Sequence, residues 1–335
     1  MQFDQLNRRE FITLLGSAEF AWPLVARAQQ PDAMRRIGVL MGIAEGDPEG
    51  QARIASFQQG LQELGWIEGR NLRFDIRRSA GATEQMRPFA KELVELKPDL
   101  IVAATTPAVA ALMQESQTVP IVFVQVVDPL SSGFISNLAR PGGNITGFVT
   151  FEFSMGGKWL ETLKQVAPRV NRVALIFHPQ TAPFSESFVR VIEAAAPSLA
   201  LETVAMPVRD SGDLEGAVSA FARSPGGGVI VLPDMFNTVH RDTLVGLAER
   251  YRLPAVYPFR YYAMSGGLIS DGVDTSDLYR RSASYVDRIL KGGKPGELPI
   301  QTPTKFELVI NLKTATGLGL EVPPTLLARA DEVIE

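Results

Sequence analysis

Near the middle of the 335-residue chain stands the stretch Arg140-Pro141-Gly142-Gly143-Asn144-Ile145-Thr146-Gly147-Phe148-Val149-Thr150. Its three glycines and its proline interrupt regular structure, and residues 145–150 then have the composition of a short strand. On either side of it, the chain carries two halves whose predicted elements follow the same order. We therefore interpret this stretch as a crossing between two lobes, and we expect the function to lie in the cleft between them.

The first half alternates short apolar runs with segments of helical periodicity. Apolar runs of this length are typical of buried parallel strands, and an apolar spacing of three to four residues is typical of helices. Strands that alternate with helices predict a parallel sheet with right-handed connections. The expected strands are 37–40, 72–76, 100–103 and 120–124, and the expected helices are 52–64, 83–96 and one that opens at Thr105-Thr106-Pro107.

The second half repeats this order. Matching positions are separated by near-constant intervals, as in Ile37 with Val173 and Pro120 with Pro254, which indicates two similar lobes. The expected strands are 173–177, 201–205, 229–232 and 254–257, and the expected helices are 185–195, 213–222 and 238–251.

The last part of the chain predicts two more crossings. Residues 266–270 are the candidate second crossing, in which Gly266 and Gly267 interrupt regular structure and a short strand follows. A late strand expected at 307–311 is the candidate third crossing. Between them a helix is predicted at 278–290, and the tail at 325–334 is expected to form a short docked helix. The predicted fold is α/β, with two similar lobes, each a parallel sheet flanked by helices, joined by a hinge of three crossings. The first lobe would comprise 34–146 and about 272–304, and the second 147–271 and about 305–335.

Composition excludes several classes of function. The net charge is −4 with both signs mixed along the chain and no basic run, so nucleic acid is not an expected partner. There are no cysteines, which excludes disulfides and thiolate metal sites. The two histidines, His178 and His240, are too few for an ordinary zinc site. We therefore expect no metal and no cofactor.

The N-terminus has the pattern of an export signal. Arg8-Arg9 precedes an apolar stretch, and Ala26-Arg27-Ala28 is a small-x-small cleavage site. Residues 1–28 are therefore predicted to be a signal peptide, of twin-arginine type or of the general secretory type, cleaved near Ala28. The alternative is an amphipathic helix that stays attached. No other segment is apolar enough to cross a bilayer, so a soluble periplasmic protein is expected.

Sequence motifs of the common enzyme classes are missing. The chain has no Gly-x-Ser-x-Gly elbow, no Gly-x-Gly-x-x-Gly after the first predicted strand, no phosphate-binding loop and no His-Glu-x-x-His. His178 and His240 are placed on opposite sides of a predicted strand pair, as loop or helix-start residues rather than catalytic bases. We therefore expect no enzymatic activity.

Polar and aromatic residues gather where the predicted strands end. The carboxyl edge of an open parallel sheet is where ligands bind. A helix start with free N–H groups suits a carboxylate, an aspartate suits an amine, and aromatic rings stack on a flat ligand. The alternatives are a plain helix cap, a turn residue and core packing, respectively. The candidates are Thr105, Thr106 and Pro107 for a carboxylate, Asp128 and Asp234 for an amine, Phe184, Phe236 and Tyr257 for stacking, and Asp47 and His178 beside them.

Several strings resemble one family, the substrate-binding proteins of ABC transporters, in the group that includes tryptophan and tyrosine binders. They are Arg8-Arg9-Glu10-Phe11-Ile12, Phe57-x-x-Gly60-Leu61-x-x-Leu64-Gly65-Trp66, Asp128-Pro129, residues 140–147, Tyr257-Pro258-Phe259-Arg260, Gly266-Gly267-Leu268 and Ala330-Asp331-Glu332-Val333-Ile334. The resemblance implies a type I periplasmic-binding fold that closes on a small ligand without catalysis. It also implies that Asp234 and Asp271 line the cleft. Asp234 belongs to a string, Pro233-Asp234-Met235-Phe236-Asn237-Thr238, that replaces the Asp-Asn-Thr-like string of the amino-acid binders, and relatives often carry Tyr in place of Asp271.

The leading hypothesis is an exported receptor, expected to be a monomer, that delivers a small solute to the membrane permease of an ABC importer. The solute would be an amino acid or another carboxylate, aromatic or not. Two alternatives remain open. One is an exported α/β enzyme that uses acidic residues of the same cleft, and the other is a ligand-sensing partner of a signalling receptor.

Overall fold

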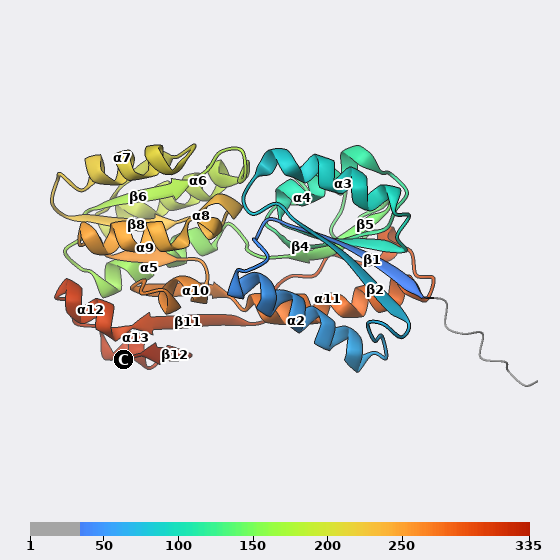
Figure 1. Cartoon of the computed structure of the whole chain (residues 1–335). Helices are drawn as coiled ribbons and strands as arrows, with labels where there is room; N and C mark the ends of the chain where they lie inside the picture. The colour runs from blue at the N-terminus through green and yellow to red at the C-terminus, as the bar shows by residue number, and fades with distance from the viewer. Residues whose placement is uncertain (1–33) are drawn as a thin grey trace, which may run out of the picture. The chain divides into compact units, whose positions relative to one another are not determined.

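A computed structural model of the protein describes residues 34–335. The predicted signal peptide, 1–28, lies outside the described residues. The described chain forms two sheets of largely parallel strands with helices packed on them (Figure 1). Within this part of the chain, no helix is long and apolar enough to cross a membrane.

The first sheet has five strands in the order β2-β1-β3-β4-β5, all parallel. Its inner strands are apolar and buried on both faces, as expected for a parallel sheet covered by helices. The strands are β1 Arg35–Met41, β2 Leu72–Arg78, β3 Leu100–Ala104, β4 Ile121–Val126 and β5 Ile145–Val149, and the helices are α2 Pro48–Glu63, η1 Thr83–Gln85, α3 Met86–Glu95 and α4 Thr106–Glu115.

The second sheet has seven strands in the order β12-β11-β10-β9-β8-β6-β7, and only β11 runs antiparallel to a neighbour, β10. The strands are β6 Arg172–Phe177, β7 Glu202–Pro207, β8 Gly227–Val231, β9 Ala255–Tyr257, β10 Ile269–Val273, β11 Phe306–Asn311 and β12 Glu332–Ile334. The helices are α5 Met155–Val166, α6 Ser185–Ala195, η2 Ala196–Leu199, α7 Ser211–Phe221, α8 Met235–Val239, α9 Arg241–Arg250, α10 Arg260–Met264, α11 Thr275–Leu290, η3 Pro295–Glu297, α12 Leu312–Leu318 and α13 Pro324–Leu327.

The two sheets share one topology. The order β2-β1-β3-β4-β5 of the first is repeated by β7-β6-β8-β9-β10 in the second, with each strand in the corresponding place. The prediction of two similar α/β lobes is confirmed. The second lobe adds β11 and β12 at one edge of its sheet.

The chain passes between the sheets three times: after β5, after β10, and before β11. After the second passage, α11 returns to the first lobe and packs along α2. The predicted crossings, 140–150, 266–270 and 307–311, fall mostly on the strands β5, β10 and β11 themselves. The glycine-rich start of the central stretch is a turn, with Gly142 at φ +75° and Gly143 at φ +59°, and its apolar continuation is β5, a buried strand at the edge of the first sheet. Bending is therefore expected next to these strands rather than within them. We propose the lobe boundaries of the sequence analysis, adjusted so that all of β5 belongs to the first lobe.

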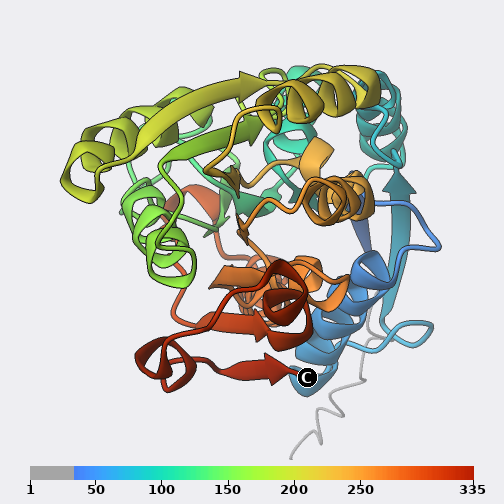
Figure 2. The ribbon, with the colours of Figure 1, turned by 90° about the vertical axis from the view of Figure 1, so that its left-hand side faces the viewer.

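The C-terminal tail is not the single helix that was expected at 325–334. It forms α13 and then β12, which pairs in parallel with β11 at the edge of the second sheet (Figure 2). Asp331 accepts a hydrogen bond from the Leu308 amide at 2.8 Å, and Glu332 pairs with Arg260 at 2.6 Å. These contacts align Val333 and Ile334 with the β11 backbone, which outweighs the helical spacing of the tail.

Candidate functional site

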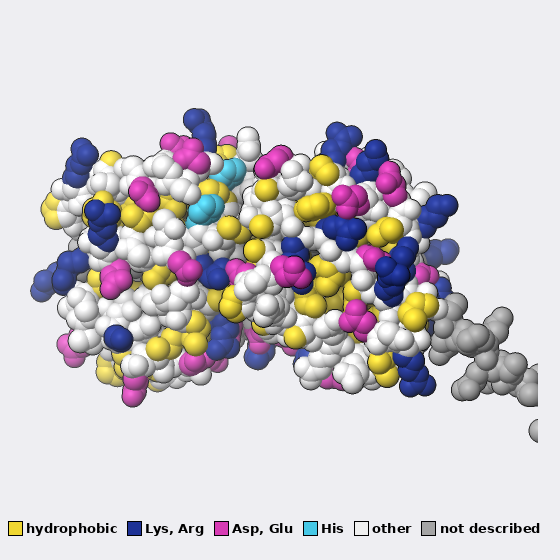
Figure 3. Space-filling model, in the orientation of Figure 1, with side chains coloured by type: hydrophobic (Ala, Val, Ile, Leu, Met, Phe, Trp, Pro, Cys, Tyr) yellow, Lys and Arg dark blue, Asp and Glu magenta, His cyan; other side chains and the backbone are white. Residues whose placement is uncertain are grey.

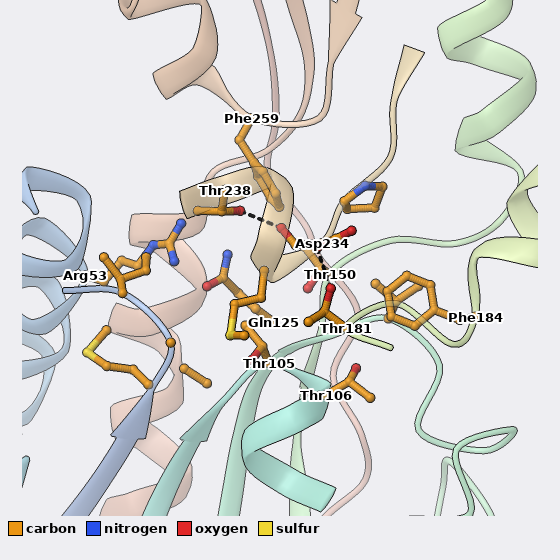
Figure 4. Close-up of a pocket in the computed structure, with 17 residues that line it drawn as sticks. Arg53, Thr105, Thr106, Gln125, Thr150, Thr181, Phe184, Asp234, Thr238 and Phe259 are labelled. Carbon is orange, nitrogen blue, oxygen red and sulfur yellow. Dashed lines mark hydrogen bonds between the residues drawn. The ribbon is translucent and has the colours of Figure 1, made fainter. Parts of the chain in front are cut away.

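A cavity lies where the two lobes meet, with about 540 Å³ of empty volume including its opening to solvent (Figure 4). It adjoins the carboxyl ends of β1, β3, β4 and β8. Both lobes and the first crossing contribute side chains. The lining residues are Met41, Gly42, Ile43, Arg53, Ala104, Thr105, Thr106, Gln125, Val127, Thr150, Thr181, Phe184, Pro233, Asp234, Met235, Thr238 and Phe259.

Of the residues singled out in the sequence, four line this cavity: Thr105, Thr106, Phe184 and Asp234. The other candidates do not line the cavity, and they are Asp47, Pro107, Asp128, His178, Phe236, Tyr257 and Asp271. Pro107 follows Thr106 in the first turn of α4. The structure thus brings together only part of the predicted set.

Asp234 is the N-cap of α8. Its carboxylate accepts hydrogen bonds from the backbone amides of Phe236 and Asn237, from the Thr181 hydroxyl at 2.8 Å and from the His178 amide at 2.7 Å. Burial raises the pKa of Asp234, and the hydrogen bonds from His178 and Thr181 oppose that shift. Three of these donors bind Oδ1, and the His178 amide alone binds Oδ2. Asp234 therefore ties the loop after β6 to α8.

The two histidines both contact the aromatic ring of Phe236. The Phe236 ring stacks on His178 with centroids 4.9 Å apart and on His240 with centroids 4.1 Å apart. The prediction that the histidines lie on opposite sides of a strand pair was wrong, because the short helix α8 brings Phe236 and His240 next to the loop after β6. Both faces of Phe236 are engaged outside the cavity.

Asp47 joins the lobes at the cavity's edge. It caps α2 by accepting from the Glu49 amide at 2.9 Å, and its other oxygen pairs with the Arg241 guanidinium of α9 at 2.7 Å. Each of these two side chains is 14% exposed. Burial alone would lower the pKa of Arg241, but the hydrogen bond and the charge of Asp47 outweigh it, so that this pKa is raised. The pair bridges an α2 residue and an α9 residue across the lobe junction.

Three other candidates serve the scaffold. Asp128 accepts from the Ser131 amide in the turn after β4. Tyr257 is buried and stacks on Tyr262 at 4.9 Å, and burial raises its pKa. Asp271, which the resemblance placed in the cleft, is 1% exposed and holds Lys158 of α5 at 2.9 Å.

Thr105 stands at the N-cap of α4, but its hydroxyl makes no capping hydrogen bond. Its backbone has φ +81° and ψ 160°, a region that is almost restricted to glycine. Gln125, at the neighbouring strand end, has φ +61° where the pairing of β4 with β5 is irregular. Two strained residues therefore border the cavity, and strain of this kind concentrates at functional sites.

Arg53 is the main lining residue that sequence reasoning missed. It is 2% exposed on the buried face of α2, and its Nε and Nη2 atoms have no hydrogen-bond partner in residues 34–335. Burial disfavours its charge, yet the pKa of Arg53 lies above its ordinary value because of Tyr261, Tyr279 and Glu49. An arginine on the apolar stripe of a predicted helix, beside Ile54 and before Phe57, is the signal that could have identified it. Thr150 and Thr238 were also missed.

The described lining of the cavity carries few charged side chains. Only Arg53 and Asp234 are charged among the described residues that line it, and Asp234 already accepts four hydrogen bonds. Within the same described part, no cluster of His, Asp and Glu is arranged to hold a metal ion. Its remaining lining combines hydroxyl groups with apolar side chains, including the rings of Phe184 and Phe259.

Residues 37–334 match the family model of ABC transporter substrate-binding proteins. The chain belongs to this family. It is 24% identical over 266 residues to the tyrosine-binding protein of Clostridioides difficile, with 79% of this chain and 76% of that protein covered. The resemblance of the sequence to the substrate-binding proteins of ABC transporters is therefore confirmed.

Solved structures support the same fold. A conserved domain protein from Vibrio cholerae is 28% identical, with a TM-score of 0.83 over 90% of this chain and 99% of that chain. The ABC domain from Streptococcus pneumoniae, solved in complex with L-Trp, is 24% identical, with a TM-score of 0.83 over 90% of this chain and all of that chain. This substrate-binding protein thus has the type I periplasmic-binding fold.

Proposed function

We propose that this substrate-binding protein is the exported receptor of an ABC importer, which closes on a small organic solute and delivers it to a membrane permease. The observation that carries the proposal is the cavity between the lobes, lined from both sides and bordered by the ion pair of Asp47 with Arg241. A site divided between two lobes binds its ligand by closing around it.

The proposed solute is an amino acid or another carboxylate, with an aromatic or aliphatic body. Phe184 and Phe259 offer rings to such a body, and Thr105, Thr106 and Thr150 offer polar groups to a carboxylate. The tyrosine-binding protein and the L-Trp complex among its relatives support this class of ligand.

Export to the periplasm completes the proposal, with cleavage near Ala28 and a monomeric mature chain. N-terminal sequencing of the protein from a periplasmic fraction tests the cleavage site. A mature chain that begins at Gln29 or Gln30 supports it, and an intact Met1 in the cytoplasm contradicts it.

Ligand binding is tested by thermal unfolding of residues 29–335 with amino acids, aliphatic carboxylates and aromatic carboxylates. A ligand that binds only the folded state stabilises it, by about 2.7 kcal/mol at 100 times its Kd. We expect at least one class to raise the melting temperature in a saturable manner. If no compound of these classes does so, the proposed receptor function for small carboxylates is wrong.

A further inference from the structure

Arg53 presents an unmatched positive charge to the cavity. Its side chain is buried among protein atoms, lines the cavity, and points toward its centre in Figure 4. In the described chain, no acidic group lies within ion-pair distance of its guanidinium, and Nε and Nη2 lack hydrogen-bond partners. A buried guanidinium remains charged at neutral pH, and leaving it without hydrogen bonds is costly.

Aromatic contact compensates this charge only in part. The guanidinium carbon lies 5.6 Å from the centroid of the Tyr261 ring, at the outer range of a cation–π contact. Arg241 approaches the same ring at 5.9 Å, but Arg241 also has Asp47 as a partner. The two arginines thus differ in one respect: Arg241 has a carboxylate within ion-pair distance, whereas in residues 34–335 Arg53 has only the more distant charge of Glu49.

Other unmatched polar atoms face the same space. The hydroxyl oxygens of Thr105 and Thr150 are buried without a hydrogen-bond partner among residues 34–335, and both residues line the cavity. Thr105 also precedes the first turn of α4, a helix of 10 residues whose N-terminal end carries a partial positive charge. A buried guanidinium, two hydroxyls and a helix N-terminus together form a site for an anionic group.

No comparable site exists for a positive group. Asp234 is the only acidic residue among the described lining residues, and its oxygens already accept four hydrogen bonds. The amide oxygen of Gln125 accepts from the Tyr279 hydroxyl at 3.3 Å. An ammonium group in this cavity would therefore have to share Asp234 with the four donors from which that carboxylate already accepts hydrogen bonds.

We propose that Arg53 anchors the carboxylate of the ligand, and that the ligand is a small organic monoanion with an apolar body and no ammonium group. This inference rests on the proposed receptor function and narrows its ligand class. The apolar remainder of the lining, with Phe184, Phe259 and Val127, accommodates the body of such a ligand. Amino acids would bind less well, because Asp234, the one acidic side chain of the described lining, is already engaged by four donors.

The test compares compounds of one shape and different charge by isothermal titration calorimetry. One set is 3-phenylpropanoate, L-phenylalanine, 2-phenylethylamine and 3-phenylpropan-1-ol, and a smaller set is 4-methylpentanoate with L-leucine. We expect the carboxylate of at least one set to bind at least tenfold more tightly than its matched amino acid. The amine and the alcohol are expected to bind still more weakly.

Variants of Arg53 test whether this residue causes the preference for a carboxylate. In Arg53→Met, the preference for the carboxylate over the neutral alcohol should fall at least tenfold, and in Arg53→Lys it should fall less. The ligand-free Arg53→Met protein should keep or gain melting temperature, because it loses a buried charge without a partner. Arg172→Met is the matched control, since Arg172 lies over the Phe221 ring at 4.7 Å, outside the cavity, and should leave the preference unchanged.

Each other outcome contradicts the inference in a distinct way. If an amino acid binds more tightly than its matched carboxylate, the charge assignment is wrong while the receptor function stands. If Arg53→Met binds as the unchanged protein does, or if its ligand-free form unfolds at a clearly lower temperature, Arg53 is a structural residue. If no compound in either set binds, both this inference and the receptor proposal for small carboxylates fail.

Discussion

At the residue scale, the cavity is bordered by backbone that the sequence does not favour. Thr105 is β-branched, yet it adopts φ +81° and ψ 160°, where glycine is almost the only residue found. The conformation directs a threonine with an unpaired hydroxyl at the cavity, next to the start of α4. Such strain persists only where the surrounding structure imposes it, and here it positions a polar group for a ligand.

The strain at Thr105 can be measured with two variants that both remove the hydroxyl. Thr105→Gly relieves the backbone, whereas Thr105→Ala keeps the disfavoured φ. We expect the glycine variant to be more stable than the alanine variant by about 1–2 kcal/mol. Urea unfolding measures this difference, and equal or reversed stabilities would show that Thr105 is unstrained. Both variants should bind the ligand more weakly than the unchanged chain.

Sequence patterns predicted the inner strands well, since runs such as 100–103 and 229–232 contain only apolar residues and must be buried. They failed for side chains whose partners are distant in sequence. Asp271 is held by Lys158, which is 113 residues away, and nothing near either residue indicates that pair. Arg53 was missed for the opposite reason: its place on an apolar helix face was visible, but its lack of a partner is a property of the folded chain.

At the element scale, α2 and α9 are joined across the lobe junction by Asp47 and Arg241. Both side chains are largely buried and their atoms lie 2.7 Å apart, so that the pair is screened less than a surface ion pair. Met235 of α8 adds an apolar contact, because it packs within the core cluster of the first lobe. These contacts hold the two lobes together at their junction.

Loss of the ion pair should therefore weaken binding more than folding. Asp47→Asn retains a capping side chain for α2 but removes the charge. We expect ligand affinity to fall roughly tenfold, since a hydrogen bond between charged groups contributes about 1.5 kcal/mol. Calorimetry measures the affinity, and thermal unfolding without ligand should change little. The matched control is Asp128→Asn in the turn after β4, and an equal loss of affinity in both variants would contradict this role.

At the scale of the whole molecule, a group of buried tyrosines makes the second lobe sensitive to alkali. Tyr261 and Tyr262 stack at 5.0 Å, and Tyr262 stacks on Tyr257. Burial raises the pKa of Tyr261 to about 12 and raises the pKa of Tyr262 well above its ordinary value. Charged side chains of both signs are interspersed over the face shown in Figure 3, which gives the surface no strong field of one sign.

The direction of the pH effect follows from these shifts. Between pH 10 and 12 the unfolded chain loses the Tyr261 proton while the folded chain keeps it, so the free energy of unfolding falls as pH rises through this range. Each such tyrosine contributes a slope of about 1.4 kcal/mol per pH unit. Urea unfolding from pH 8.5 to 11 measures the slope. Tyr261→Phe should flatten it and Tyr251→Phe should not, and a slope unaffected by Tyr261→Phe would rule out this origin.

The central claim is that the two lobes close on a small ligand. Because the chain has no cysteine, Lys91→Cys on α3 and Glu215→Cys on α7 provide two unique positions for spin labels, one on each lobe. Double electron–electron resonance then measures the distance between the lobes. With the panel compound of highest affinity at saturation, the distance distribution should become shorter and narrower than without it. An identical distribution with and without that ligand would contradict the account.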